Sequence, residues 1–158
     1  GERTYSLLTQ VAGRAGRGDR PGQVLVQTYN PDHYCIVAAQ RNDYEGLYRY
    51  ERALRKDRGL PPFGFLVLLV VASLKEEQSQ ELAERLAELL LERAIPPLAL
   101  EGPAPAPLHR LKGSYRWQLL AKGPDPEALR CWIRDTLALL PASERAKVQV
   151  SVDPVDLC

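Results

Sequence analysis

The second part of the sequence predicts an α+β fold, because strand and helix patterns follow one another there in the order βαββαβ. A continuous apolar run at 65–73 suits a buried strand, and two stretches with helical spacing flank a pair of strand patterns. A final segment, 148–152, alternates apolar and polar residues. This order is that of the split βαβ, or ferredoxin-like, arrangement, an antiparallel sheet with two helices on one face.

The first part of the sequence predicts helices around one short strand. An apolar stripe recurs at helical spacing near the start, and glycines then interrupt it. Asn30 and Pro31 suit the beginning of a helix, and residues 42–45 offer a capping box for the next one. In chain order we expect a helix over 4–14, a short buried strand over 23–28, a helix over 32–40 and a helix from 42–45 to about Gly59.

The elements of the second part follow from the same two periodicities. The apolar content of the first strand indicates burial on both faces and hence a central position. Proline pairs and the Lys112-Gly113 turn separate the later segments. In chain order we expect the central strand at 65–73, a helix ending near 93, a short strand at 98–101, a proline-spaced stretch, a strand at 115–122, a helix beginning at 125 and an edge strand at 148–152.

The composition describes a globular protein whose charge is local rather than global. The chain has 158 residues, 45% of them hydrophobic, which suits one to two small domains. Its 21 basic and 20 acidic residues give a net charge of +1, so any basic surface must be local. Three widely spaced cysteines favour a reducing cytoplasm over a disulfide framework or a zinc site. The chain opens Gly-Glu-Arg and contains no methionine, so we expect it to be interior to a longer protein.

The most informative motif is residues 10–17, Gln-Val-Ala-Gly-Arg-Ala-Gly-Arg. Arg14 and Arg17 are three positions apart and each follows a glycine, which allows close approach to a ligand. Guanidinium groups in such an array can neutralise a phosphate that gains charge during phosphoryl transfer. Gln10 can hydrogen-bond a phosphate or the attacking water. A solvated basic turn after a helix is the alternative interpretation, and residue content alone does not decide between the two.

A second candidate site lies at 104–123, which contains five basic or histidine side chains and no acidic residue. Cations there can contact phosphates while an aromatic ring stacks on a base, as in nonspecific single-strand binders. Trp117 lies on the opposite strand face from Arg116, so a core position is favoured for Trp117 over base stacking. The predicted nucleic-acid contacts are Arg110, Lys112, Tyr115 and Arg116.

The remaining polar residues carry less information. His33 and His109 are isolated from other ligand types, so no metal site is predicted. The arginines between 49 and 58 suit a solvated helix face, with a nucleic-acid footprint as the alternative. No apolar run approaches the roughly 18 residues of a membrane-spanning helix.

QVAGRAGR resembles motif VI of superfamily 2 helicases. With its flanks, LLTQVAGRAGRGDRPGQVLVQTYNP, it is similar to the primosomal protein N′ family of replication-restart DNA helicases in particular. Further family-like segments occur in the same order and extend the resemblance over essentially the whole chain. They are Asp43-Tyr44-Glu45-Gly46, Leu60-Pro61-Pro62-Phe63, Gly102-Pro103-Ala104-Pro105, Tyr115-Arg116-Trp117-Gln118 and Val152-Asp153-Pro154.

The resemblance implies a domain plan and a set of nucleotide contacts. Residues 1–60 would be the end of the second RecA-like helicase lobe, 61–64 a linker and 65–158 a C-terminal DNA-binding domain. Gln10, Gly13, Arg14 and Arg17 would reach the ATP on the first lobe, with the two arginines as arginine fingers. The sequence contains no GxxxxGK[ST] phosphate loop, no DEAH-type magnesium motif and no cysteine-rich zinc module. The longer parent would supply the sites for ATP, Mg²⁺ and zinc, and this chain alone is predicted to be inactive.

The resemblance also implies a function and partners. The parent would be an ATP-hydrolysing 3′–5′ DNA helicase that recognises stalled or repaired forks and starts primosome assembly. Its partners would be forked and single-stranded DNA, single-stranded DNA-binding protein and primosome proteins, in the nucleoid region of the bacterial cytoplasm and not at a membrane. The alternative is a non-catalytic nucleic-acid-binding module with a vestigial helicase segment.

Overall fold

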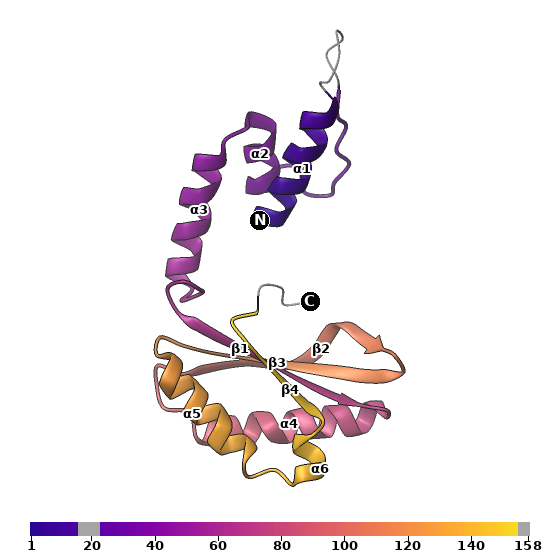
Figure 1. Cartoon of the computed structure of the whole chain (residues 1–158), viewed down its shortest axis with the longest axis vertical. Coiled ribbons are helices and arrows are strands. Elements are labelled where there is room, and N and C mark those ends of the chain that lie inside the picture. The colour runs from indigo at the N-terminus through magenta and orange to yellow at the C-terminus, as the bar shows by residue number, and fades with distance from the viewer. Residues whose placement is uncertain (16–22, 155–158) are drawn as a thin grey trace. The chain divides into compact units, whose positions relative to one another are not determined.

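The computed structural model describes residues 1–15 and 23–154. The chain divides into two compact units, Gly1–Leu54 and Arg55–Cys158 (Figure 1). Each unit has its own cluster of buried apolar residues.

The first unit is helical. Helix α1 (Glu2–Ala15) packs against α2 (Tyr34–Arg41), and α3 (Tyr44–Asp57) follows. The small core lies between these helices and contains Tyr5, Cys35, Ile36, Ala38 and Leu47. The predicted helix over 4–14 is therefore confirmed, and the helix predicted over 32–40 begins slightly later.

The cap of α3 lies one residue beyond the predicted start of its capping box. The Asp43 carboxylate accepts a 2.8 Å hydrogen bond from the Gly46 amide, as an N-cap side chain does. Asn42 instead ends α2 in the left-handed conformation, with φ of 52°. The two residues therefore serve different helices.

The predicted strand at 23–28 is wrong, because this segment is irregular and exposed. Leu25 is 98% exposed. A strand needs a neighbour to accept and donate its backbone hydrogen bonds, and within the described residues this segment pairs with none. Val24 and Val26 instead line a pocket together with Leu8 and Ile36.

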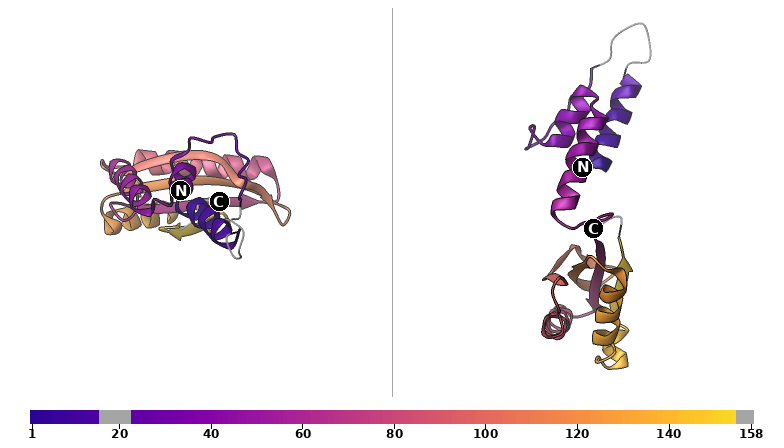
Figure 2. Two further views of the ribbon diagram at one scale, coloured as in Figure 1. Left: turned by 90° about the horizontal axis from the view of Figure 1, so that it is seen from above. Right: turned by 90° about the vertical axis from the view of Figure 1, so that its left-hand side faces the viewer.

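The second unit contains a four-stranded antiparallel sheet in the order β2-β3-β1-β4. This is the predicted split βαβ order. Figure 1 shows α4 and α5 beneath the sheet, and the views in Figure 2 keep them on one side of it. The elements are β1 (Phe65–Ser73), α4 (Glu76–Glu92), β2 (Ala99–Leu111), β3 (Ser114–Gly123), α5 (Pro126–Leu137), α6 (Ala142–Arg145) and β4 (Val148–Val152).

The core of this unit lies between the sheet and the two helices. Alternate residues of β1 face it, among them Leu69, which is fully buried. Leu86 of α4 and Leu129 of α5 meet it from the other side. The Trp132 indole donates a 3.0 Å hydrogen bond to the Leu90 carbonyl and so joins α5 to α4. Strand β1 is buried on both faces, as its composition predicted.

Strand β2 is longer than the predicted strand at 98–101, because it continues through the proline-spaced stretch to Leu111. Proline lacks an amide hydrogen and would interrupt a central strand. β2 is an edge strand with β3 as its single neighbour, so the prolines are tolerated there. Register shifts between Glu101 and Ala104 and between Pro105 and Arg110 absorb the irregularity.

Candidate functional site

The arginine-glycine motif begins on the last turns of α1. Gln10, Gly13 and Arg14 are exposed on this helix. Residues four apart share a helix face, so the Gln10 amide and the Arg14 guanidinium are presented together. Gly16 and Arg17 lie outside the described residues. The described part of the motif is thus a solvent-facing donor pair able to bind a phosphate.

Gly13 has a conformation that any residue adopts. A Cβ built there meets nothing within 4 Å, so packing inside the described chain does not require glycine. A glycine that is unnecessary for the fold leaves space for a ligand next to Arg14.

The second candidate site is the β2–β3 hairpin. Lys112 and Gly113 form its two-residue turn, with φ of 50° and 84°, as the sequence predicted. Arg110 lies opposite Tyr115 across the ladder, and its guanidinium carbon is 5.1 Å from the centre of that ring. These two side chains therefore form a cation–π pair on the face that carries the helices.

Arg116 points to the other face of the sheet. It neighbours Tyr115 along β3 and lies opposite Ala72 of β1, away from the core. Leu111 and Ser114 are paired and share that face. The structure thus brings Arg110 and Tyr115 together, with Lys112 at the tip, and places Arg116 on the opposite side.

His109 connects the hairpin to α4, and no pattern of residues in the sequence indicated this contact. Its ring centroid is 5.7 Å from Tyr115 and 6.2 Å from Trp117. Its Nε2 is 3.5 Å from Glu76 Oε1 at the start of α4, which suits ion pairing but is not a well-formed hydrogen bond. This cluster fixes the hairpin on its helix-facing side.

Trp117 packs, partly buried, against the main core. Its Nε1 atom is buried, and no residue in the described ranges accepts a hydrogen bond from it. This position corresponds to the core role that strand alternation favoured. On the helix-facing side Arg110 is exposed, whereas Tyr115 and Trp117 are both half-buried.

A buried acid in the first unit has a structural explanation. Glu51 is 7% exposed, and its Oε1 accepts a 2.6 Å hydrogen bond from the Tyr34 hydroxyl. Burial, followed by this hydrogen bond to Glu51, raises the pKa of Tyr34 above its ordinary value. The pair ties α2 to α3 and requires no catalytic role.

The arginine-rich side of α3 is partly engaged within the protein. Arg49 forms a 2.8 Å ion pair with Glu45 one turn earlier. Arg55 donates a 3.2 Å hydrogen bond to the Pro61 carbonyl. Both arginines therefore make contacts within the protein that stabilise α3 and the segment after it.

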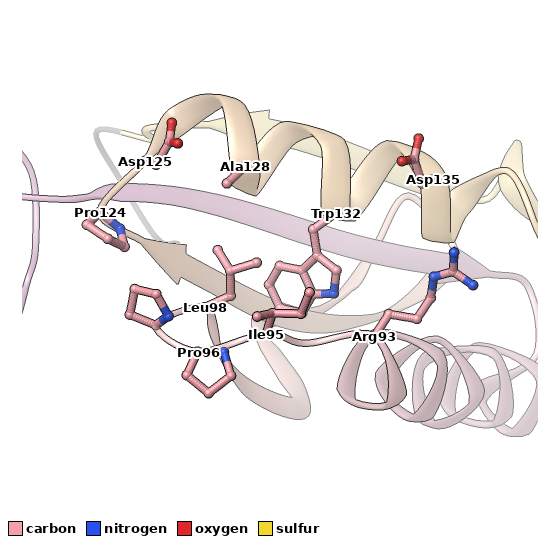
Figure 3. A pocket seen from close by; sticks show the side chains of 10 residues that line it. Arg93, Ile95, Pro96, Leu98, Pro124, Asp125, Ala128, Trp132 and Asp135 are labelled. Carbon is pink, nitrogen blue, oxygen red and sulfur yellow. The ribbon is translucent and has the colours of Figure 1, made fainter.

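The second unit contains an apolar pocket of about 490 Å³. Figure 3 shows the side chains that line it. Prolines, Leu98 and Trp132 form much of its wall. Its two carboxylates already have partners, because Asp125 caps α5 through the Glu127 amide and Asp135 pairs with Arg134. The pocket is therefore an apolar cavity in which neither carboxylate is available as a catalytic acid or base. The described residues contain no cluster suited to a metal ion.

None of the helices in the described ranges is long and apolar enough to cross a membrane.

The chain is similar to one protein family along nearly its whole length. Residues 56–155 match the family described as Primosomal protein N C-terminal domain. Over 96% of its length the chain is 35% identical to replication restart protein PriA of Bacillus subtilis. It is 35% identical over 99% of its length to the protein of that name from Haemophilus influenzae, and 36% identical over 99% to the one from Synechocystis.

The chain spans about a fifth of the length of these relatives, namely 19%, 22% and 18% respectively. The matched family range begins one residue after the start of the second compact unit.

Proposed function

The chain belongs to the PriA family of primosomal proteins, and from this premise we propose that it is the C-terminal portion of an ATP-dependent 3′–5′ DNA helicase that restarts replication at stalled or repaired forks. In this proposal the first unit contributes motif VI to the ATP site and the second unit contacts DNA. The observation that carries the DNA-binding part is the exposed turn region of the β2–β3 hairpin, residues 110–113, within a segment from 102 to 124 that contains no acidic residue.

The proposed ATP site is shared with a lobe outside this chain. The exposed Gln10 and Arg14 share one face of α1, which supports their contact with nucleotide phosphates. Arg17 is proposed as the finger on the γ-phosphate, and Gly13 as a point of close approach. The parent would hold the phosphate loop, the Mg²⁺ ligands and a zinc module. Without them, an arginine finger has no transition state to stabilise.

The proposed DNA site uses Arg110, Lys112, Tyr115 and Arg116. Lysine and arginine neutralise phosphates without reading the base sequence, which suits recognition of a DNA structure rather than a DNA sequence. Within the parent, we also propose single-stranded DNA-binding protein and primosome proteins as partners, in the nucleoid region of the bacterial cytoplasm.

A non-catalytic nucleic-acid-binding module is the second candidate function. It is favoured by the second unit, which has its own core and a complete antiparallel sheet. The reading frame decides between the two. A phosphate loop encoded upstream supports the helicase, whereas a translation start beside Gly1 supports the module.

Binding of the chain to labelled forked and single-stranded DNA over a salt series tests the DNA-binding part. Arg110→Glu/Lys112→Glu should reduce the affinity for both DNAs and lower the slope of log K against log salt by about 2, since two phosphate contacts are lost. The matched control is Arg93→Glu/Arg145→Glu, which makes the same charge change at two exposed arginines elsewhere. An equal loss of DNA affinity in both variants would show that the affinity depends on the total charge and not on the hairpin. That outcome would contradict the proposal.

A further inference from the structure

We propose that the β2–β3 hairpin is a strand-separating wedge whose two faces each contact a different strand of branched DNA. The inference rests on the proposed DNA-binding function and adds to it a mode of engagement. In this proposal the tip of the hairpin, at Lys112 and Gly113, lies at the junction of a fork, where the two strands of a duplex separate.

The first argument is the placement of the cations on both faces of the hairpin. Arg110 lies on the helix-facing side with Tyr115, whereas Arg116 lies on the opposite side with Ser114. One DNA strand passing along one face of the ribbon reaches one of these arginines. Two backbones separated by the thickness of the ribbon reach both, and Lys112 at the turn lies between them.

The second argument is the apolar tip. Leu108 and Leu111 are 55% and 43% exposed. Leu111 lies opposite Ser114, a side chain too small to cover it. Leucine is among the apolar residues that proteins insert between base steps to unstack them. Leu111 lies between Arg110 and Lys112, and Leu108 precedes Arg110 by two residues. These apolar side chains beside cations suit a surface that contacts bases at its edge and phosphates next to them.

The third argument is charge complementarity. The segment from 102 to 124 contains no acidic residue. Glu76 is near His109 on the helix-facing side, and Glu101 lies 2.6 Å from Lys122, so both carboxylates lie beside a basic group. From residue 102 to the turn and back along β3, the hairpin therefore presents no carboxylate of its own that would repel a polyanion.

The fourth argument is that the hairpin is held in place. Its second strand, β3, lies inside the sheet and pairs with β1 along nine positions. On the helix-facing side, His109 contacts Tyr115 and Trp117 and approaches Glu76 of α4. A hairpin anchored in this way can separate two strands without first folding around them.

A forked duplex with 2-aminopurine in the base pair next to the junction tests the wedge. Binding of the chain should raise the 2-aminopurine fluorescence, because the base loses its stacking partner. Leu108→Ser/Leu111→Ser should keep the affinity of the original chain and lose the fluorescence increase. The matched control is Leu91→Ser/Leu139→Ser, at two leucines that are 57% and 53% exposed elsewhere in the same unit. Full fluorescence increase in the tip variant would overturn the wedge.

Cross-linking from adjacent residues tests the two-strand geometry. Ser114 and Tyr115 are neighbours that point to opposite faces of β3. Replacing each in turn with the photoreactive residue benzoylphenylalanine should label different strands of the fork. Labelling of a single strand from both positions, or equal labelling of an unbranched duplex, would overturn the proposal and indicate a hairpin lying in a groove.

The outcomes separate the wedge from the proposed function. No DNA binding by the unaltered chain contradicts the proposed function itself. A second outcome is salt-sensitive binding that depends on Arg110 and Lys112 but shows no unstacking and no cross-linking of Ser114 and Tyr115 to different strands. This outcome supports DNA binding by the hairpin and contradicts the wedge.

Discussion

Tyr34 illustrates how a single side chain can stabilise the helical unit through its protonation state. Its hydroxyl must keep a proton in order to donate to Glu51, and its partial burial also disfavours the phenolate. Because the pKa in the folded chain is above the ordinary value, the stabilisation is complete below pH of about 10 and is lost as the pH rises through the folded-state pKa.

Tyr34→Phe should therefore lower the free energy of unfolding of the first unit by about 1–2 kcal/mol at neutral pH. The difference from the original chain should shrink as the pH rises above about 10, because the tyrosine of the unfolded chain then loses its proton while the folded one still keeps it. Urea unfolding followed by far-UV circular dichroism measures both effects. Tyr48→Phe, at an exposed tyrosine of α3, is the control. A difference that is independent of pH would contradict this account.

At the scale of elements, the sequence predicted what depends on local periodicity. Strand β1 begins and ends at the predicted residues, and the Lys112-Gly113 turn lies where its dipeptide indicated. The error at 23–28 arose because alternation shows a strand-like pattern but not a pairing partner. Likewise, the face taken by Arg110 depends on the register shift after Pro105, which is a property of two strands together.

The hairpin turn requires glycine for its backbone conformation alone. Gly113 has φ of 84°, and a Cβ there meets nothing within 4 Å. Gly113→Ala should therefore destabilise the second unit by about 1–2 kcal/mol, the cost of a left-handed residue with a side chain. Denaturant unfolding followed by tryptophan fluorescence reports this unit, since both tryptophans, Trp117 and Trp132, belong to it.

Gly13→Ala is the matched control, with the opposite sign, and its unfolding is followed by far-UV circular dichroism because residues 1–54 contain no tryptophan. Its Cβ also meets nothing, but the residue lies within α1, so alanine should stabilise the helix by about 0.5–1 kcal/mol. Shifts of opposite sign and of these sizes would attribute both effects to backbone conformation. Destabilisation by Gly13→Ala would indicate crowding next to Arg14.

At the scale of the whole molecule, the two units divide the proposed work. The α1 face that presents Gln10 and Arg14 belongs to the first unit, and the hairpin belongs to the second. The sequence indicated both motifs through residue type and spacing. It did not indicate that the hairpin cations divide between two faces, because that depends on the sheet.

An ATP hydrolysis assay tests whether this chain alone contains a complete nucleotide site. We expect no turnover above background from this chain, with or without DNA, when phosphate release is followed. Joined to a lobe with a phosphate loop and Mg²⁺ ligands, the protein should hydrolyse ATP, and Arg17→Ala should reduce kcat by about 10³ while DNA affinity is unchanged. Turnover by the chain alone that is lost in Arg17→Ala would show that a complete site exists here.

The prolines of β2 also bear on how this sheet behaves in a crowded solution. The sheet has two outer edges, β2 and β4. Positions 103, 105 and 107 of β2 lack the amide hydrogens that an incoming strand would bind, whereas β4 carries no proline. If two molecules paired through their β4 strands, the two β2 strands with their prolines would form the outer edges of the combined sheet. Because the prolines disfavour the addition of a further strand at these edges, association of this kind ends at a dimer and does not continue into a fibre.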